Sequence, residues 1–150
     1  GIVYQYQGNL NQAISDYGKT IEINPLLAEA YYNRGSIYQY QGNLNQAISD
    51  YGKAIEIAPG HSGAYNNRGI AYQHQGNFDR AIANYNKAIK INPGYAIAYN
   101  NRGLAYQNKG NLNQAISDYS KAVEINPGYA TAYSNRAAAY GLKQDSKREK

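Results

Sequence analysis

The 150-residue sequence contains no cysteine, methionine or tryptophan, one phenylalanine and only four prolines. Without cysteine, neither a disulfide framework nor a thiolate metal site is available, and we expect no metal or other cofactor. The absence of cysteine fits the reducing cytoplasm but equally fits an exported protein. No run of about 18 apolar residues occurs, so no membrane span is predicted. No signal peptide is recognisable either.

Basic residues exceed acidic ones, but they are scattered along the chain. The formal net charge is +5 at pH 7, and the segment 143–150, with four cations and two anions, supplies +2 of it. The remaining lysines and arginines alternate with acidic residues rather than forming one stripe. Because phosphate binding requires a concentrated basic face, we predict that nucleic acid is not a partner.

The four prolines lie 34 residues apart, and nearly everything between them repeats at the same interval. Such a period indicates a solenoid, in which each unit is a hairpin that buries its apolar face only against its neighbours. The sequence starts in mid-repeat without methionine, so we expect it to be a fragment. The predicted units are a partial repeat at 1–27, full repeats at 28–61, 62–95 and 96–129, a half repeat (one helix) at 130–142, and a polar tail at 143–150.

Each full repeat is predicted to contain two helices, called helix A and helix B. In the middle repeat, apolar or small residues at helical spacing define helix A over 64–75 and helix B over 77–92. Between them a glycine is expected to form the left-handed C-cap of helix A, and the asparagine after it to cap helix B. Proline followed by glycine then turns the chain into the next repeat. The predicted capping glycines are Gly8, Gly42, Gly76 and Gly110, each followed by Asn9, Asn43, Asn77 or Asn111.

This pattern resembles the tetratricopeptide repeat family over essentially the whole chain. The resemblance implies an all-α, right-handed superhelical solenoid of antiparallel helix pairs that serves as a scaffold for protein or peptide partners. Most tyrosines fall at framework positions, so we interpret them as core residues rather than as a stacking platform. The motif residues are an aromatic at Tyr31, Tyr65, Tyr99 and Tyr133; a small residue at Gly35, Gly69, Gly103 and Ala137; tyrosine at Tyr4, Tyr38, Tyr72, Tyr106 and Tyr140; alanine at Ala13, Ala47, Ala81 and Ala115; tyrosine at Tyr17, Tyr51, Tyr85 and Tyr119; and Ala54, Ala88 and Ala122.

Members of this family bind ligands in a concave groove lined mainly by helix A. Solvent-facing helix A positions are therefore the candidate peptide-binding residues. They are Asn33, Asn67, Asn101 and Asn135; Tyr32, Asn66 and Asn100, with Ser134; Gln39, Gln73 and Gln107; and Tyr40, His74 and Asn108.

The first of these sets places one asparagine in each repeat. An amide offers a donor and an acceptor, so a ladder of amides can hold an extended peptide by its backbone. This ladder is similar to the one in the tetratricopeptide superhelix of O-linked N-acetylglucosamine transferases. The alternative interpretation is that the asparagines cap or bridge adjacent A helices. A carboxylate clamp is not supported, because the positions that need lysine or arginine hold neutral residues.

The repeated arginines Arg34, Arg68, Arg102 and Arg136 stand where the family commonly has leucine. We expect each stem to pack on tyrosine while the guanidinium pairs with an aspartate of its own or the preceding repeat, and a ligand-facing arginine is the alternative. Neither of the two histidines, His61 and His74, has a recurring nucleophile or carboxylate partner, so no enzymatic activity is predicted.

Both ends of the array lack convincing polar caps. At the carboxyl end the apolar stripe of Tyr133, Ala137 and Tyr140 would face water unless the tail folds over it. We therefore predict end-to-end association or capping by a partner. Three hypotheses for function follow: a non-catalytic peptide-binding scaffold, a self-assembly module, or the substrate-recruiting arm of a larger enzyme such as a glycosyltransferase.

Overall fold

The computed structural model describes residues 2–148, without the side chains of residues 2–7 and 147. In this range the chain forms α-helices and no β-strand. No helix among these residues is both long and apolar enough to span a membrane. The helices are α1 (Ile2–Ile23), α2 (Ala28–Tyr40), α3 (Leu44–Ile57), α4 (Ser62–His74), α5 (Phe78–Ile91), α6 (Ala96–Asn108), α7 (Leu112–Ile125) and α8 (Ala130–Arg148).

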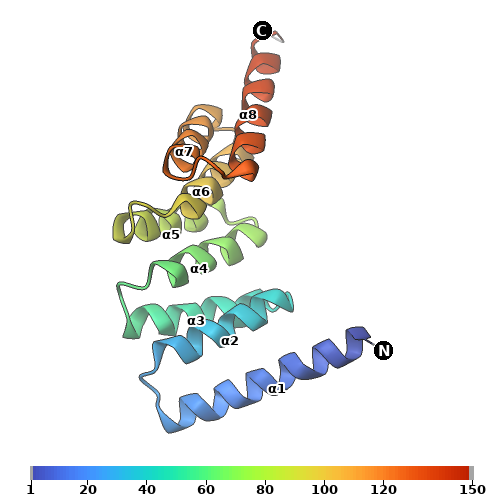
Figure 1. Ribbon diagram of the computed structural model, residues 1–150, viewed down its shortest axis with the longest axis vertical. Helices are drawn as coiled ribbons and strands as arrows, with labels where there is room; N and C mark the ends of the chain where they lie inside the picture. Colours follow the sequence, from blue (N-terminus) through green and yellow to red (C-terminus); the bar gives the residue numbers. More distant parts are fainter. Residues whose placement is uncertain (1, 149–150) are drawn as a thin grey trace.

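The helices stack in chain order as an elongated solenoid, with α1 at one end and α8 at the other (Figure 1). Each helix packs against the next, and the first helices of neighbouring repeats also touch, in the pairs α2 with α4, α4 with α6, and α6 with α8. Successive hairpins are rotated relative to one another, so that α1 and α8 run in clearly different directions in this view. The all-α repeat solenoid expected from the sequence is confirmed.

Glycine ends helix A in each of the three full repeats, as predicted. Gly42, Gly76 and Gly110 have φ values of 79°, 74° and 79°, in the left-handed region where a Cβ is disfavoured. The N–H of Gly42 donates to the carbonyl of Gln39, and the N–H of Asn43 donates to that of Tyr38 at 2.8 Å. These two bonds form a Schellman motif. The asparagine that follows precedes helix B in every case, but only Asn77 caps with its side chain, accepting from the N–H of Arg80 at 3.2 Å.

The turn predicted at Gly8 and Asn9 does not form, and this prediction was wrong. Both residues lie inside α1, which runs without interruption from residue 2 to residue 23, and Gly8 has no left-handed φ. Glycine permits the left-handed turn but does not require it. In the full repeats helix A also packs on the helix that precedes it, which is α1, α3 or α5, and the described chain has no helix before α1. The predicted framework residue Tyr4 lies outside the described side chains.

Residues 143–148, predicted as the start of a polar tail, continue α8 as far as Arg148. They therefore do not fold back over the apolar stripe. The repeat spacing would put the helix-ending glycine at position 144, where the sequence has Gln144. Because a residue with a side chain disfavours the left-handed region, the helix does not turn there.

The core is a ribbon of alanine and tyrosine between the helices. Tyr51, Tyr85 and Tyr119 are fully buried on helix B, and the ring of each lies against the glycine on helix A of its own repeat. A Cβ at Gly69 would lie 2.6 Å from Cε1 of Tyr85. Small residues thus let the two helices approach closely while tyrosine fills the space beside them.

We expect Gly69→Ala to lower the free energy of unfolding by about 1–2 kcal/mol, because overpacking outweighs the helix propensity that alanine adds. Urea denaturation measures the change. Gly141→Ala is the matched control, since this helical glycine has no atom within 4 Å of an added Cβ. That substitution should stabilise the chain by about 0.5–1 kcal/mol. Equal effects of the two substitutions would contradict the packing argument.

Candidate functional site

The first helices of the repeats lie side by side and share hydrogen bonds between their polar side chains. Nδ2 of Asn67 on α4 donates to the hydroxyl of Tyr32 on α2 at 3.1 Å. Nδ2 of Asn101 on α6 donates to Oδ1 of Asn66 on α4, also at 3.1 Å. Nδ2 of Asn135 on α8 repeats the bond to Asn100 on α6 at 3.0 Å. We call this row of residues on α2, α4, α6 and α8 the helix A face.

A bond within α4 joins two of these contacts into one path. Nδ2 of Asn66 donates to Oδ1 of Asn67 at 3.2 Å, so side-chain hydrogen bonds connect Asn101, Asn66, Asn67 and Tyr32. Asn67, Asn101 and Asn135 therefore bridge adjacent A helices, which was the alternative to ligand binding. Their Nδ2 groups are used between helices, whereas Oδ1 of Asn101 and of Asn135 takes part in no hydrogen bond among the described residues.

Two predicted ligand-binding residues are buried. Asn66 and Asn100 were expected to face solvent, but their exposed fractions are 2% and 5%, so this prediction was wrong. The neighbouring helix A covers this position, and a buried amide must then find a hydrogen-bond partner inside the protein. Asn67 and Asn101 are half-buried, as are Tyr32, Asn33 and Asn135. Ser134, at the same repeat position on α8, is exposed.

The three glutamines of the candidate set hold the buried tyrosines of their own repeats. Oε1 of Gln39, Gln73 and Gln107 accepts from the hydroxyl of the tyrosine 12 residues later, at 2.7, 2.8 and 2.9 Å. Burial raises the pKa of Tyr119 to about 12 and also raises the pKa of Tyr85, so both hydroxyls keep their protons at neutral pH. These glutamines have a structural role whether or not a ligand binds.

The last candidate set lies at the carboxyl ends of the A helices. Tyr40, His74 and Asn108 are all exposed. The aromatic side chain of Tyr40 has an exposed fraction of 72%. The Asn108 amide donates to the carbonyl of Leu104 at 2.9 Å. The predicted exposure of this set agrees with the structure.

His61, which the sequence singled out only as a histidine without a catalytic partner, has a structural role. Its Nδ1 accepts from the N–H of Ala64 at 3.1 Å and so caps α4. Its ring lies 4.6 Å from the ring of Tyr32, between centroids, and Nε2 is 3.3 Å from Oε1 of Glu29. The signal was available in the repeat pattern, because His61 occupies the position just before helix A, which is the N-cap position.

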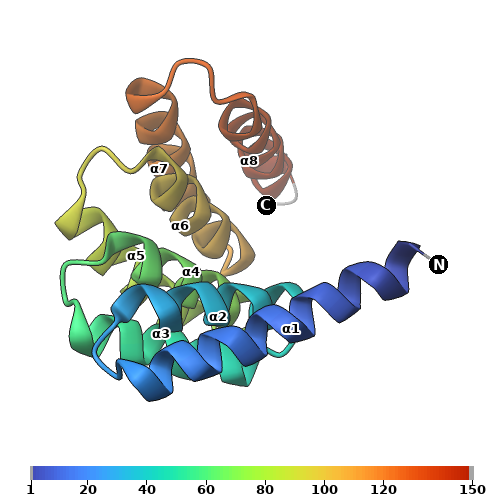
Figure 2. The same ribbon diagram turned by 60° about the horizontal axis from the view of Figure 1, so that its bottom comes forward.

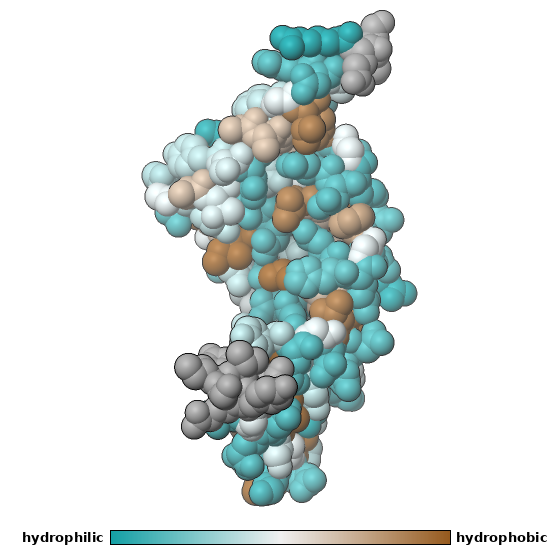
Figure 3. Space-filling view, turned by 90° about the vertical axis from the view of Figure 1, so that its right-hand side faces the viewer, coloured by the Kyte–Doolittle hydropathy of each residue, from teal (hydrophilic) through white to brown (hydrophobic). Residues whose placement is uncertain are grey.

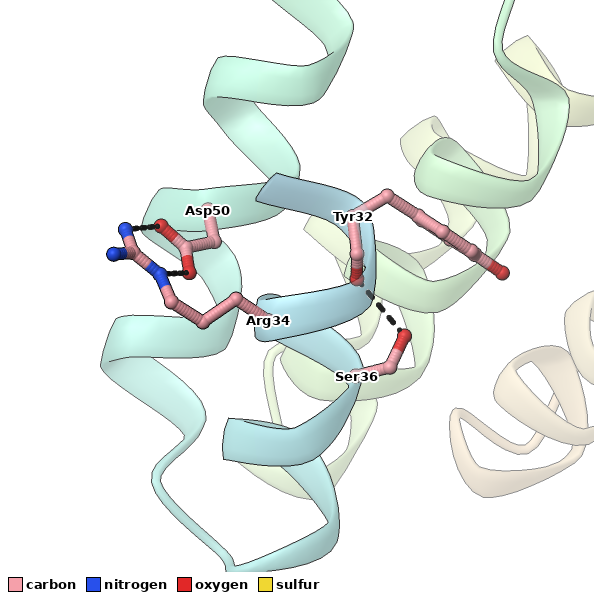
Figure 4. A network of polar contacts seen from close by, with 4 residues as sticks. All are labelled: Tyr32, Arg34, Ser36 and Asp50. Atoms are coloured by element: carbon pink, nitrogen blue, oxygen red, sulfur yellow. Dashed lines mark hydrogen bonds and ion pairs between the residues drawn. The ribbon is translucent and has the colours of Figure 1, made fainter. Parts of the chain in front are cut away.

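The arginines point to helix B and not to the helix A face. Arg34 donates to both carboxylate oxygens of Asp50, at 2.7 and 2.8 Å, on the side of α2 opposite Tyr32 (Figure 4). Arg102 makes the same double contact with Asp118 at 2.8 and 2.6 Å. Each guanidinium also lies over a tyrosine three residues earlier, 5.8 Å from the Tyr31 ring in the first case. The predicted pairing with aspartate is confirmed for Arg34 and Arg102, whereas Arg68 donates to Asn84 and Arg136 to the Ser120 hydroxyl.

Family models for the tetratricopeptide repeat match residues 26–93 and 96–129, and a third model for the same repeat matches residues 1–42. A crystal structure of MamA is 31% identical in sequence and superposes with a TM-score of 0.86, covering 93% of this chain and 82% of that one. The chain belongs to the tetratricopeptide repeat family. No curated protein sequence matches it.

Other solved tetratricopeptide domains resemble this array at lower identity. The first such domain of human RPAP3 is 26% identical with a TM-score of 0.80, covering 85% of this chain and all of that one. A structure of the first domain of Spaghetti (RPAP3) bound to the HSP90 peptide SRMEEVD is 27% identical with a TM-score of 0.76, covering 78% of this chain and 93% of that one.

Proposed function

We propose that this tetratricopeptide array is a non-catalytic interaction scaffold that binds an extended segment of a partner protein along the concave helix A face. The observation that carries the proposal is the row of amides fixed by bonds between helices. Because Nδ2 of Asn101 is held by Asn66, its Oδ1 has a defined orientation before any ligand arrives. Such an acceptor can receive a peptide N–H without first losing side-chain entropy.

The chemistry of the face favours a ligand held by its backbone rather than by its charge. Helices α2, α4 and α6 contain no lysine. Of their three arginines, Arg34 and Arg102 pair with aspartates of helix B, and Arg68 donates to Asn84 of helix B. The RPAP3 domain supports peptide binding as a use of this fold, since it was solved with an HSP90 peptide. In the present chain the neutral amides and the exposed residues Tyr40, His74 and Asn108 favour an uncharged, polar or aromatic segment.

The positions and contacts of the two histidines support a non-catalytic role. His61 uses Nδ1 as a helix cap, and His74 is exposed at the end of α4. The recruiting arm of a larger enzyme stays a prediction about sequence outside these 150 residues.

The proposal predicts that removing two amides weakens peptide binding. Peptides are selected by phage display on the intact chain, and a selected synthetic peptide is titrated by fluorescence polarisation. At about 0.5–1.5 kcal/mol for each hydrogen bond, Asn101→Ala combined with Asn135→Ala should weaken binding roughly 5- to 150-fold. Binding by neutral groups should also change little with salt.

The matched control is Gln114→Ala, an exposed amide on α7 outside the helix A face, which should bind the peptide like the unmodified chain. Circular dichroism confirms that each variant is folded. Selected peptides that bind the double variant undiminished, or a selection that yields no peptide, would contradict the proposal.

A further inference from the structure

Helix α5 differs in charge from the B helices on either side of it. Helices α4 and α5 form the middle hairpin of the array, between the hairpins α2–α3 and α6–α7 (Figure 2). Helices α3 and α7 each contain one aspartate, one lysine and one glutamate, which gives a net charge of −1. Helix α5 contains one aspartate, one arginine and two lysines, which gives +2. The middle hairpin is therefore locally cationic.

Arg68, on α4, lacks the carboxylate that pairs with the equivalent arginines. Position 84 on α5 carries Asn84, whereas α3 and α7 carry aspartate there. Nε of Arg68 donates to Oδ1 of Asn84 at 2.8 Å, and Nη1 and Nη2 donate to no atom among the described residues. The preceding helix offers no side-chain acceptor at Gly52, where an added Cβ would lie 3.7 Å from Nη1. Because Arg68 is only half-buried, its two free nitrogens can bind an anion from outside.

Lys87 and Lys90 add two further cations on α5. In the flanking repeats the lysine of helix B bonds to a glutamate three residues later, as Lys53 does to Glu56 at 2.8 Å. Lys90 stands in the place of that glutamate, and residues three apart are neighbours on the surface of a helix. Lys87 and Lys90 are both exposed, and neither has a carboxylate partner in the part of the chain that the structure describes.

The three cations belong to one surface, which we call the cationic face: Arg68, Lys87 and Lys90. In the last full repeat the residues at the equivalent positions line one depression, and they are Arg102, Lys121 and Glu124. Since the repeats share one backbone arrangement, the cationic face occupies the same place on the middle repeat. Arg34, the equivalent of Arg68 in the first full repeat, points to the side of α2 opposite Tyr32 (Figure 4). The cationic face is therefore separate from the helix A face.

We infer that the cationic face binds an acidic segment of a partner protein, which supplies the carboxylates that α5 lacks. The flanking repeats show the chemistry, because there the arginine pairs with aspartate and the lysine with glutamate. One carboxylate of the ligand can accept from both Nη1 and Nη2 of Arg68, which is the two-bond geometry that a guanidinium favours. A second carboxylate of the same segment then binds at Lys87 and Lys90.

A short acidic segment fits this surface better than other classes of ligand. A few cations neutralise only a few phosphates, whereas nucleic-acid-binding proteins gather basic residues over a wider stripe. The net negative charge of α3 and α7 also repels a long polyanion on both sides of α5. Apolar docking has less support, because hydrophobic residues on the face drawn in Figure 3 lie in small separate areas among hydrophilic ones.

The test restores the carboxylates to the middle repeat. Asn84→Asp combined with Lys90→Glu gives α5 the residues that α3 and α7 have at these positions, so the variant should fold. The probe is a fluorescein-labelled oligoglutamate peptide of about eight residues, titrated by fluorescence polarisation. Binding to the variant should be at least about tenfold weaker, because its cations then pair with the chain's own carboxylates. Raising the salt from about 50 to 300 mM should also weaken binding to the unmodified chain.

Moving the site to the first full repeat is the complementary experiment. Asp50→Asn with Glu56→Lys, added to the first two substitutions, removes the equivalent carboxylates from α3. It frees Arg34 and Lys53, so binding of the oligoglutamate should return. Arg34 suits this role because the residue 16 positions before it is also a glycine, Gly18, as Gly52 is for Arg68.

Two controls separate the cationic face from net charge and from the helix A face. The exposed substitutions Asn113→Asp, Gln114→Glu and Gln144→Glu together lower the net charge as much as the first variant does, and should change binding less than about twofold. Asn101→Ala with Asn135→Ala, the variant that tests the helix A face, should also leave oligoglutamate binding intact. Circular dichroism confirms that each variant is folded.

Several outcomes would overturn the inference. They are an unmodified chain that does not bind the oligoglutamate, a restored variant that binds it as tightly, and an equal loss of binding in the net-charge control. Tighter binding of a single-stranded oligonucleotide of the same charge would assign the surface to nucleic acid instead.

Discussion

Tyr85→Ala is expected to lower the free energy of unfolding by about 3–5 kcal/mol, the range for removal of a buried aromatic side chain. Tyr85 is fully buried in the middle of the array, where its ring contacts the Gly69 backbone. Its hydroxyl donates to Oε1 of Gln73 at 2.8 Å, so the substitution leaves a cavity and also removes a hydrogen bond. Urea denaturation followed by circular dichroism measures the loss.

Two further variants separate the contributions of the ring and the hydroxyl. Tyr85→Phe keeps the ring and should cost only about 1 kcal/mol, the typical net value of one hydrogen bond. Tyr133→Ala removes the tyrosine of α8 that is 43% exposed and should cost less than Tyr85→Ala. If Tyr85→Phe proved as damaging as Tyr85→Ala, the hydroxyl rather than the packing would hold the two helices together.

The repeats of the solenoid could be predicted because the same capping residues and the same helical spacing of apolar residues recur in each full repeat. Glycine at Gly42, Gly76 and Gly110 occurs in the same context, and all three adopt the left-handed cap. Gly8 shares that context and does not turn. The local sequence permits the turn there, but among the described residues α1 has no preceding helix to pack against, whereas α2, α4 and α6 each pack on one. Periodicity therefore predicted the interior of the array better than its ends.

The candidate site was predicted less completely, because helical spacing does not say how close two neighbouring helices come. Asn66 and Asn67 are adjacent in sequence, and both are predicted from the sequence to lie on the open side of helix A. The approach of α4 to α6 buries Asn66 and makes it the acceptor for Asn101. A spacing of 35 residues, one more than the repeat, is the signal for this bond. This spacing predicts a contact only when the rotation between successive A helices is known.

The second large effect is expected for Arg102→Ala, which should destabilise the chain by about 3 kcal/mol or more. Asp118 is 5% exposed, and both of its carboxylate oxygens accept from Arg102. Removing the arginine leaves a buried charge without its partner, which is far more costly than losing an exposed ion pair. The same arginine also donates to Oδ1 of Asn86 in the preceding repeat at 2.7 Å, so the loss includes a contact between repeats.

The chain contains its own matched control for this effect. Arg68 occupies the same position one repeat earlier but donates to the neutral Asn84 at 2.8 Å, so Arg68→Ala leaves no buried charge. It should cost about 1 kcal/mol for the hydrogen bond, plus the packing of its stem on Tyr65. Asp118→Asn in the Arg102→Ala background should then recover stability, because it recreates the neutral side chain that position 84 already has. Equal losses for the two arginines in urea denaturation, with no recovery by Asp118→Asn, would show that the arginine stems and not the buried charge stabilise the hairpins.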